Sequence, residues 1–158
     1  MAYFTIDDCA ARCAPGRLIR RIDKLMASWI EADFPAGDIN FSQWVALKLV
    51  RDGRTRNPGE LARELGHTTG AVTRLIDGLE QRGLLARNRA GGDRRVVSLV
   101  ITAEGIDKVN LLAPAVVGPW NEVFAEFDRA EFEALVAGLS RLLAAVERKA
   151  GDVEELAA

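Results

Sequence analysis

The chain has 158 residues, of which 49% are hydrophobic and 28% are charged, as is usual for a soluble globular protein. That length suffices for one compact domain, with or without helical extensions. No apolar run approaches the roughly 18 residues that a membrane-spanning helix needs, and the N-terminus shows no basic region followed by an apolar one. These features argue against a membrane protein or a secreted one, and we expect a cytoplasmic protein.

The net charge of −2 conceals an uneven distribution along the chain. Residues 54–95 contain nine arginines and five acidic residues, a local charge of +4, which leaves −6 for the remainder. A basic segment in an acidic chain is a candidate for contacting nucleic-acid phosphates. An ordinary solvated surface would have the same charges, so charge alone does not decide between the two.

The only two cysteines, Cys9 and Cys13, stand in an N-terminal segment, residues 1–16, that we expect to be flexible. With one histidine in the chain, a zinc site built from three or four Cys and His ligands is not expected. We predict neither a metal nor another cofactor. The two thiols form a candidate redox switch, and two ordinary thiols in a flexible segment are the simpler alternative.

Residues 17–53 are predicted to form two helices that act as scaffold and dimerisation elements. From Arg17 to about Asp33, apolar residues recur three and four positions apart, as on one face of a helix. The second helix starts near Asn40 or Ser42, either of which suits an N-cap.

The third predicted helix opens a DNA-binding module at residues 54–102. Asn57 is a favourable N-cap, Pro58 suits the first helical position, and Glu60 completes a capping box. Gly66 ends this short helix, because glycine readily adopts the positive φ of a helix C-terminus.

A fourth helix follows a turn of about three residues, with Thr68 or Thr69 as its cap, and continues to about Arg82. Two helices joined by a short, glycine-containing turn are the signature of a helix-turn-helix. The small Ala62 allows the two helices to approach closely, and Val72 fills the space between them.

Residues 84–89 and 96–101 are predicted strands, joined by a glycine-rich turn. Four arginines cluster around that turn: Arg87, Arg89, Arg94 and Arg95. An arginine-rich hairpin directly after a helix-turn-helix is typical of a wing, which contacts backbone phosphates or the minor groove. A solvated turn with arginines for charge balance is the alternative.

Residues 103–150 are predicted to form two dimerisation helices. The first begins at Thr102, whose hydroxyl suits an N-cap. Pro114 and Pro119 each remove a backbone donor, so we expect a kink or a break between Ala113 and Trp120.

The second of these helices opens at Asp128, where Glu131 completes a capping box, and precedes an acidic tail at 151–158. The terminal helices carry more apolar surface than the DNA module can cover. Two-fold self-association is the simplest way to bury it, and packing within one copy is the alternative. The expected fold is mainly α with a small β-hairpin, a winged helix-turn-helix between N- and C-terminal dimerisation helices.

Three stretches of sequence belong together: ELARELGHTTGAVTRLIDGLEQRGLLAR at Glu60–Arg87, DRR at Asp93–Arg95 and LVITAEG at Leu99–Gly105. In combination they resemble the MarR family of bacterial transcriptional regulators. The resemblance implies an obligate homodimer that binds double-stranded DNA at a pseudo-palindromic operator, usually as a repressor. It also implies release by small aromatic or phenolic acids or, in one subgroup, by cysteine oxidation. The two prolines of the fifth helix depart from the family's pattern.

Arg74 is the best candidate for a base contact, since it faces away from Val72 and arginine binds guanine bidentately. Neighbours at the start of the fourth helix share that face: Thr68, Thr69, Gly70 and Thr73. Three hairpin arginines are expected to contact backbone phosphates or the minor groove: Arg87, Arg94 and Arg95. Asp93 is expected to orient one of these arginines.

The resemblance places an effector pocket between the dimerisation helices and the DNA-binding lobe. Aromatic walls with one polar group suit a planar acid, which makes four residues candidates: Trp29, Phe34, Trp44 and His67. The alternative is that each tryptophan belongs to the core, which is more common for this residue, and that His67 simply lies at the turn.

Two further functions stay open. One is a redox-responsive regulator that uses Cys9 and Cys13, and the other is a winged-helix protein-interaction module that never meets DNA. An enzyme is not expected, because the sequence offers no nucleophile–base–orienter set, no glycine-rich phosphate loop and no metal cluster.

Overall fold

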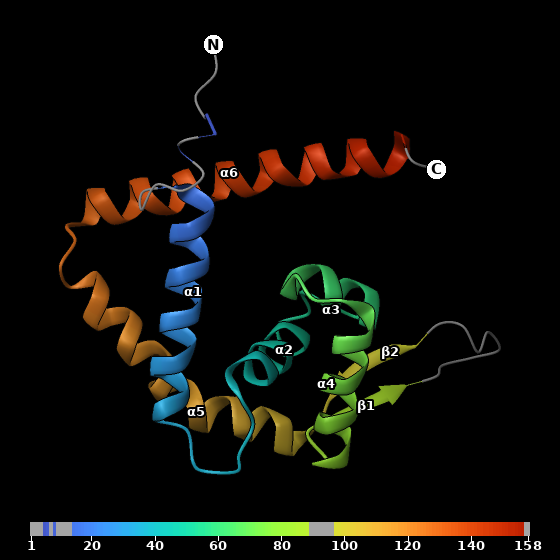
Figure 1. Ribbon diagram of the computed structural model, residues 1–158. Coiled ribbons are helices and arrows are strands. Elements are labelled where there is room, and N and C mark those ends of the chain that lie inside the picture. The colour runs from blue at the N-terminus through green and yellow to red at the C-terminus, as the bar shows by residue number, and fades with distance from the viewer. Residues whose placement is uncertain (1–4, 7, 9–13, 89–96, 157–158) are drawn as a thin grey trace. The chain divides into compact units, whose positions relative to one another are not determined.

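The computed structural model describes residues 5–6, 8, 14–88 and 97–156. In this part of the chain, six helices and one antiparallel pair of strands follow one another (Figure 1). They are α1 (Pro15–Ala32), α2 (Phe41–Arg51), α3 (Pro58–Leu65), α4 (Thr69–Gln81), β1 (Leu85–Asn88), β2 (Ser98–Ile101), α5 (Ala103–Phe124) and α6 (Arg129–Leu156). The predicted fold class, mainly α with a small hairpin, is confirmed.

The chain separates into two compact units, Met1–Pro119 and Trp120–Ala158, called here the N-terminal and C-terminal units. The N-terminal unit holds α1 to α4, the hairpin and most of α5, and the C-terminal unit holds the end of α5 and all of α6. Among the described helices, none combines the length and apolarity that crossing a membrane requires.

Side-chain caps determine where the helices begin. The Asn40 side chain accepts a hydrogen bond from the Gln43 N–H at 2.8 Å, and the Gln43 side chain accepts one from the Asn40 N–H at 3.0 Å. This reciprocal capping box selects Asn40 over Ser42 as the start of α2. The other predicted caps also form, at Asn57, Thr68, Thr102 and Asp128. The capping box predicted with Glu60 does not form, because the Glu60 side chain accepts a hydrogen bond from the Arg56 N–H and not from that of Asn57.

The core of the N-terminal unit draws on all five of its helices. Its largest fully buried apolar side chains come from these helices and from the loop between α1 and α2: Ile30, Ile39, Leu47, Leu61, Val72, Ile76, Leu79 and Val109. Full burial of one such side chain contributes about 1.5–3 kcal/mol. Three of these residues belong to α4, so α4 is held firmly within the unit.

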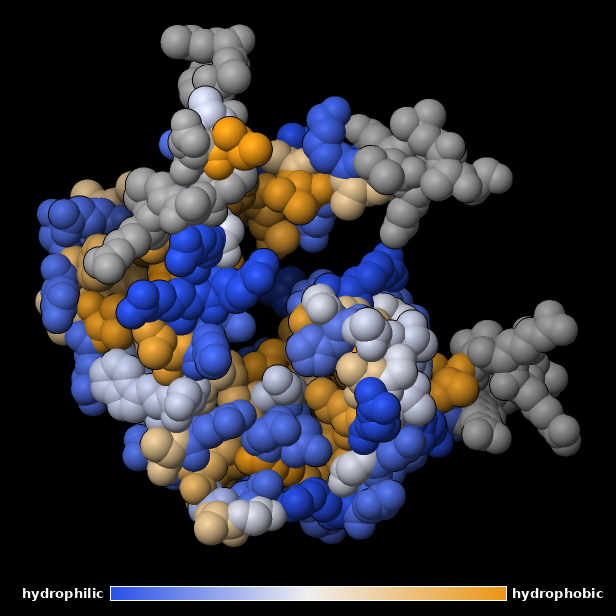
Figure 2. All heavy atoms as spheres, viewed as in Figure 1, coloured by the Kyte–Doolittle hydropathy of each residue, from blue (hydrophilic) through white to orange (hydrophobic). Residues whose placement is uncertain are grey.

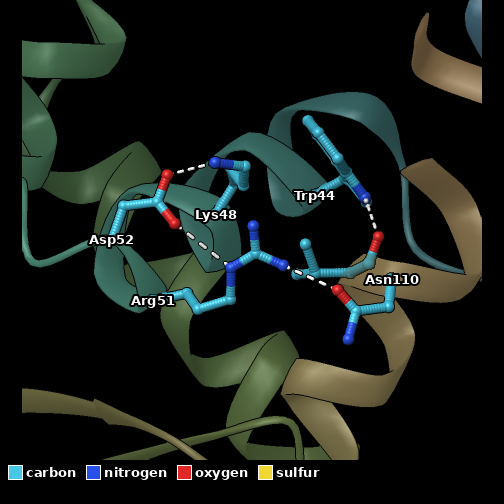
Figure 3. Close-up of polar contacts among 6 residues, drawn as sticks. Trp44, Lys48, Arg51, Asp52 and Asn110 are labelled. Carbon is cyan, nitrogen blue, oxygen red and sulfur yellow. Dashed lines mark hydrogen bonds and ion pairs between the residues drawn. The ribbon is translucent and has the colours of Figure 1, made fainter.

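Two side-chain hydrogen bonds join α2 to α5 (Figure 3). The Trp44 indole N–H donates to the Val109 carbonyl oxygen at 3.2 Å, and Arg51 Nη1 donates to Asn110 Oδ1 at 2.8 Å. Asp52 accepts a further hydrogen bond from Arg51 Nε at 3.1 Å, which orients the guanidinium toward α5. Together these contacts hold the first half of α5 against α2.

We predicted a kink or a break between Ala113 and Trp120. α5 continues as one helix from Ala103 to Phe124, so the break does not occur. Pro114 and Pro119 each remove one backbone donor, but the neighbouring hydrogen bonds of the helix remain. The boundary between the two compact units nevertheless falls directly after the second proline.

An aromatic cluster joins α5 to α6 within the C-terminal unit. The Phe124 ring stacks on Trp120 with centroids 5.5 Å apart, and it meets Phe127 and Phe132 edge-on at 5.8 and 4.8 Å. Such pairs add stability beyond the burial of their area. The cluster therefore fixes the turn between the two helices.

α6 extends through Gly151 to Leu156, although we expected the acidic tail to begin at residue 151. A glycine inside a helix costs only about 1 kcal/mol relative to alanine. That cost lowers the local stability of the helix without ending it.

Each unit leaves a row of large apolar side chains exposed on a helix. On α1 these side chains are 42–58% exposed: Leu18, Ile19, Ile22, Leu25 and Trp29. On α6 they are 37–60% exposed: Phe132, Leu135, Val136, Leu139, Leu142, Leu143 and Val146. Figure 2 shows apolar atoms among charged ones on the visible face of α1. Rows of this kind commonly mark an interface with another chain.

Asp38 ties the loop after α1 to α5. Its carboxylate accepts a hydrogen bond from Lys108 Nζ at 2.8 Å and another from the Ile39 N–H at 2.8 Å. Burial by itself would raise the pKa of Asp38. The hydrogen bonds from Lys108 and Ile39, with the positive charges of Lys108 and Arg82, outweigh burial and lower that pKa below its ordinary value.

A carboxyl group whose pKa folding lowers stabilises the folded state above its unfolded pKa of about 3.9, and that contribution disappears as the pH falls through the folded value. Asp38→Asn should therefore lower the free energy of unfolding at pH 7 by roughly 1–3 kcal/mol. It should also weaken the loss of stability below about pH 4. Urea denaturation at a series of pH values measures both effects. Asp107→Asn, an exposed carboxylate on α5, is the control, and identical pH profiles for the two variants would contradict the assignment.

Candidate nucleic-acid interface

The turn between α3 and α4 consists of Gly66, His67 and Thr68. Gly66 has a φ of +61°, a left-handed conformation that glycine adopts without strain. The His67 N–H donates to the Ala62 carbonyl oxygen at 3.0 Å, and Thr68 Oγ1 accepts a hydrogen bond from the Ala71 N–H at 3.3 Å. These bonds define the direction in which α4 leaves the turn.

α4 has one buried face and one exposed face. Val72, Ile76 and Leu79 are fully buried, at spacings of four and three residues that place them on one side of the helix. The residues predicted to contact DNA are exposed at its start and along its first turns: Thr68, Thr69, Gly70, Thr73 and Arg74. The folding of α4 therefore brings these five residues together at the surface.

Arg74 is exposed and has no hydrogen-bond or ion-pair partner among the described residues. Its guanidinium has five N–H donors, none of which binds a described residue. Thr73 is partly committed, because its hydroxyl donates to the Thr69 carbonyl oxygen at 2.9 Å. The oxygen of that hydroxyl can still accept a hydrogen bond.

The hairpin is attached to the unit along its outer edges. β1 and β2 pair antiparallel, with Arg87 opposite Leu99. The Leu99 N–H donates to the Arg56 carbonyl oxygen at 2.8 Å, so the chain before α3 lies along the outer edge of β2. Residues 89–96 lie outside the described part of the chain, so DNA contacts by three wing residues stay predictions: Asp93, Arg94 and Arg95.

Arg87 has a different environment from Arg74. Its Nη2 lies 2.7 Å from Asp77 Oδ1, its Nη1 pairs with Glu80 Oε2, and its backbone N–H donates to Glu80 Oε1 at 2.8 Å. The Arg87 side chain is 21% exposed. We did not predict this cluster from the sequence, where the available signal was the i, i+3 spacing of two carboxylates on α4.

The four residues predicted to line an effector pocket lie in different environments. Trp44 is buried, and its N–H is committed to Val109. Trp29 is 42% exposed on α1, and Phe34 is half-buried just after α1. His67 lines an open hollow of about 560 Å³ with residues of α3 and the start of α4. Trp44 thus belongs to the core, and ligand contacts by all four residues stay predictions.

The redox hypothesis rests on Cys9 and Cys13, which lie outside the described part of the chain. The hypothesis therefore stays a prediction from the sequence.

The sequence model of the MarR family matches residues 38–96. The HTH-type transcriptional repressor YetL of Bacillus subtilis is 26% identical over 123 residues, which cover 77% of this chain and 74% of YetL. The residues that match the family model, 38–96, run from the loop before α2 into the hairpin and so include α3 and α4.

Solved structures share the fold. MepR of Staphylococcus aureus in complex with DNA superposes with a TM-score of 0.72 at 20% identity, covering 84% of this chain and 96% of MepR. BpsR of Bordetella bronchiseptica, whose DNA binding is regulated by 6-hydroxynicotinic acid, superposes with a TM-score of 0.71 at 24% identity, covering 81% of this chain and 91% of BpsR. The winged-helix fold is thus shared over most of the chain.

Proposed function

We propose that the chain is a DNA-binding transcriptional regulator of the MarR family, a homodimeric repressor that a small aromatic acid releases from a pseudo-palindromic operator. The family match over residues 38–96 and the similarity to YetL and MepR support this proposal. The exposed face of α4 carries this proposal. Its threonines and Arg74 face solvent, whereas Val72, Ile76 and Leu79 anchor the helix. A helix held in this way presents its first turns to the major groove as one rigid surface.

Arg74 is the residue that we assign to base recognition. It is exposed and unpartnered among the described residues, and a bidentate pair with guanine is the commonest specific contact of arginine. The wing arginines, Arg94 and Arg95, are assigned to backbone or minor-groove contacts, which strengthen binding without reading the sequence directly.

A dimer is proposed because both units expose apolar rows that would otherwise remain in water. Two-fold symmetry is the commonest solution for a self-associating surface. It would also present two copies of α4 to successive turns of the duplex, which accounts for a palindromic site. The segments 17–53 and 103–150 are accordingly proposed as the dimerisation elements, with 54–102 as the DNA-binding domain.

A planar aromatic acid is proposed as the effector because Trp29, Phe34 and His67 supply aromatic surface and one polar side chain outside the core. The regulation of BpsR by 6-hydroxynicotinic acid supports this class of ligand. The residues that the ligand contacts in this chain are part of the proposal.

Arg74→Ala should abolish the preference for one base pair. Selection from random duplex DNA identifies the operator, and competition binding then measures the affinity for the operator and for random duplex. The variant is expected to lose roughly 1–3 kcal/mol on the operator, with a much smaller loss on random DNA. Arg129→Ala, in the C-terminal unit, is the control. Equal losses on both duplexes would show that Arg74 contacts phosphate instead.

Leu139→Arg should disrupt the dimer, because it places a charge in the exposed apolar row of α6. Light scattering is expected to give two copies for the wild type and one for the variant. The affinity for the palindromic duplex is expected to fall by roughly 100-fold, since each half-site would be bound separately. Ala137→Arg adds the same charge outside the row and should change neither quantity. A wild type that elutes as a single copy at micromolar concentration overturns the dimer.

Aromatic acids should release the protein from DNA. Benzoate and 6-hydroxynicotinate are expected to weaken operator binding, whereas cyclohexanecarboxylate, which has the same charge but no planar ring, should not. Trp29→Leu should reduce the response, because it removes an aromatic surface. Equal responses to the aromatic and aliphatic acids, or no response to either, would exclude the proposed class of ligand.

A further inference from the structure

We propose that Arg87 is a positioning residue that fixes the hairpin to α4 through Asp77 and Glu80, instead of contacting DNA itself. This inference rests on the proposed DNA-binding function, because the hairpin positioned in this way is the wing of that function. The two carboxylates belong to the helix that presents Arg74, so one cluster couples the two DNA-contacting parts of the domain.

The geometry of the cluster favours positioning over DNA contact. Arg87 Nη2 lies 2.7 Å from Asp77 Oδ1, and Nη1 pairs with Glu80 Oε2. A planar guanidinium held by two carboxylates has lost most of the rotational freedom that it would need to reach a phosphate. The three side chains together carry a net charge of −1, so the cluster as a whole does not attract a polyanion.

The backbone is held at the same place. The Arg87 N–H points away from β2 and donates to Glu80 Oε1 at 2.8 Å, so one carboxylate binds both the side chain and the main chain of Arg87. On the opposite edge of the hairpin, the Leu99 N–H donates to the Arg56 carbonyl oxygen at 2.8 Å. Arg87 and Leu99 face each other across the strands, so the hairpin is held from both sides at one level.

The Arg87–Leu99 pair lies close to the end of the described hairpin. Only Asn88 separates Arg87 from the segment 89–96, which carries Arg94 and Arg95. The direction of β1 at Arg87 therefore sets the direction of the chain at Asn88, the last described residue before the turn. Partial burial strengthens the ion pair that fixes β1 to α4. The Arg87 and Glu80 side chains are only 21% and 29% exposed, so salt screens their attraction less than that of a surface pair.

The two possible roles of Arg87 predict opposite effects of neutralising Glu80 on the affinity for DNA. If Arg87 contacted phosphate, neutralising Glu80 would free it and remove a negative charge near DNA, so binding would tighten. If Arg87 positions the wing, neutralising Glu80 loosens the hairpin, so binding weakens although a negative charge is lost. The Arg87→Lys substitution adds a second distinction. Lysine keeps the charge that a phosphate contact needs, but it lacks the fork that spans two carboxylates.

The experiment compares Glu80→Gln and Arg87→Lys with the control Glu64→Gln, which removes one exposed negative charge from α3. Affinity for the selected duplex is measured at one salt concentration, and thermal unfolding identifies any variant that fails to fold. We expect Glu80→Gln and Arg87→Lys each to weaken binding by roughly tenfold and Glu64→Gln to leave it unchanged or slightly tighter. Tighter binding by Glu80→Gln, or wild-type binding by Arg87→Lys, overturns the proposal.

A double-mutant cycle with Arg94→Ala separates positioning of the wing from a general loss of stability. If Arg87 acts through the wing, Arg94→Ala should cost less affinity in the Glu80→Gln protein than in the wild type. Fully additive losses would overturn the proposal.

Hydrogen exchange of the β1 amides is the readout that does not depend on DNA. We expect β1 to exchange several-fold faster in Glu80→Gln than in Glu64→Gln, and equal rates would overturn the proposal. A wild type that binds no duplex, with this difference in exchange intact, would refute the proposed function and leave the positioning role of Arg87 supported.

Discussion

The burial of one face of α4 is the constraint on which the rest of the molecule depends. Val72, Ile76 and Leu79 are fully buried against the other helices of the N-terminal unit. Truncating one such side chain typically costs about 2–5 kcal/mol, a large part of the stability of a domain of this size. Because this face is inside, the threonines and Arg74 are necessarily outside. The chemistry proposed for the surface thus follows from the packing of the core.

Polar contacts connect that core to the helix that leads into the C-terminal unit. Trp44 and Arg51 of α2 bind the Val109 carbonyl oxygen and the Asn110 side chain of α5, before either proline of α5. The position of the early part of α5 is therefore coupled to the domain that carries α4. These bonds also hold Trp44 within the core.

Local signals made much of the fold predictable. Side-chain caps such as Asn57 and Asp128, and the positive φ of Gly66, depend on only a few neighbouring residues. They can therefore be predicted from the local sequence. The helix-turn-helix and the amphipathic pattern of α4 follow from the same local rules. The same pattern predicts that the five candidate DNA-contacting residues lie on the exposed face of α4, as they do.

The features that sequence reasoning missed depend on competition between distant or weak effects. α5 passes through Pro114 and Pro119 and α6 passes through Gly151, because a helix with many other contacts tolerates one lost hydrogen bond or one unfavourable residue. The Arg87 cluster joins β1 to α4, and an arginine in a basic hairpin gives no sign in the sequence that two carboxylates already hold it.

The salt dependence of duplex binding tests the central claim most directly, since contact between this surface and DNA must displace counterions from the phosphates. The affinity of the full chain for its selected duplex should be measured between about 50 and about 200 mM salt. We predict a straight line in a double-logarithmic plot, with a negative slope of several units. An affinity that does not change with salt would contradict the account.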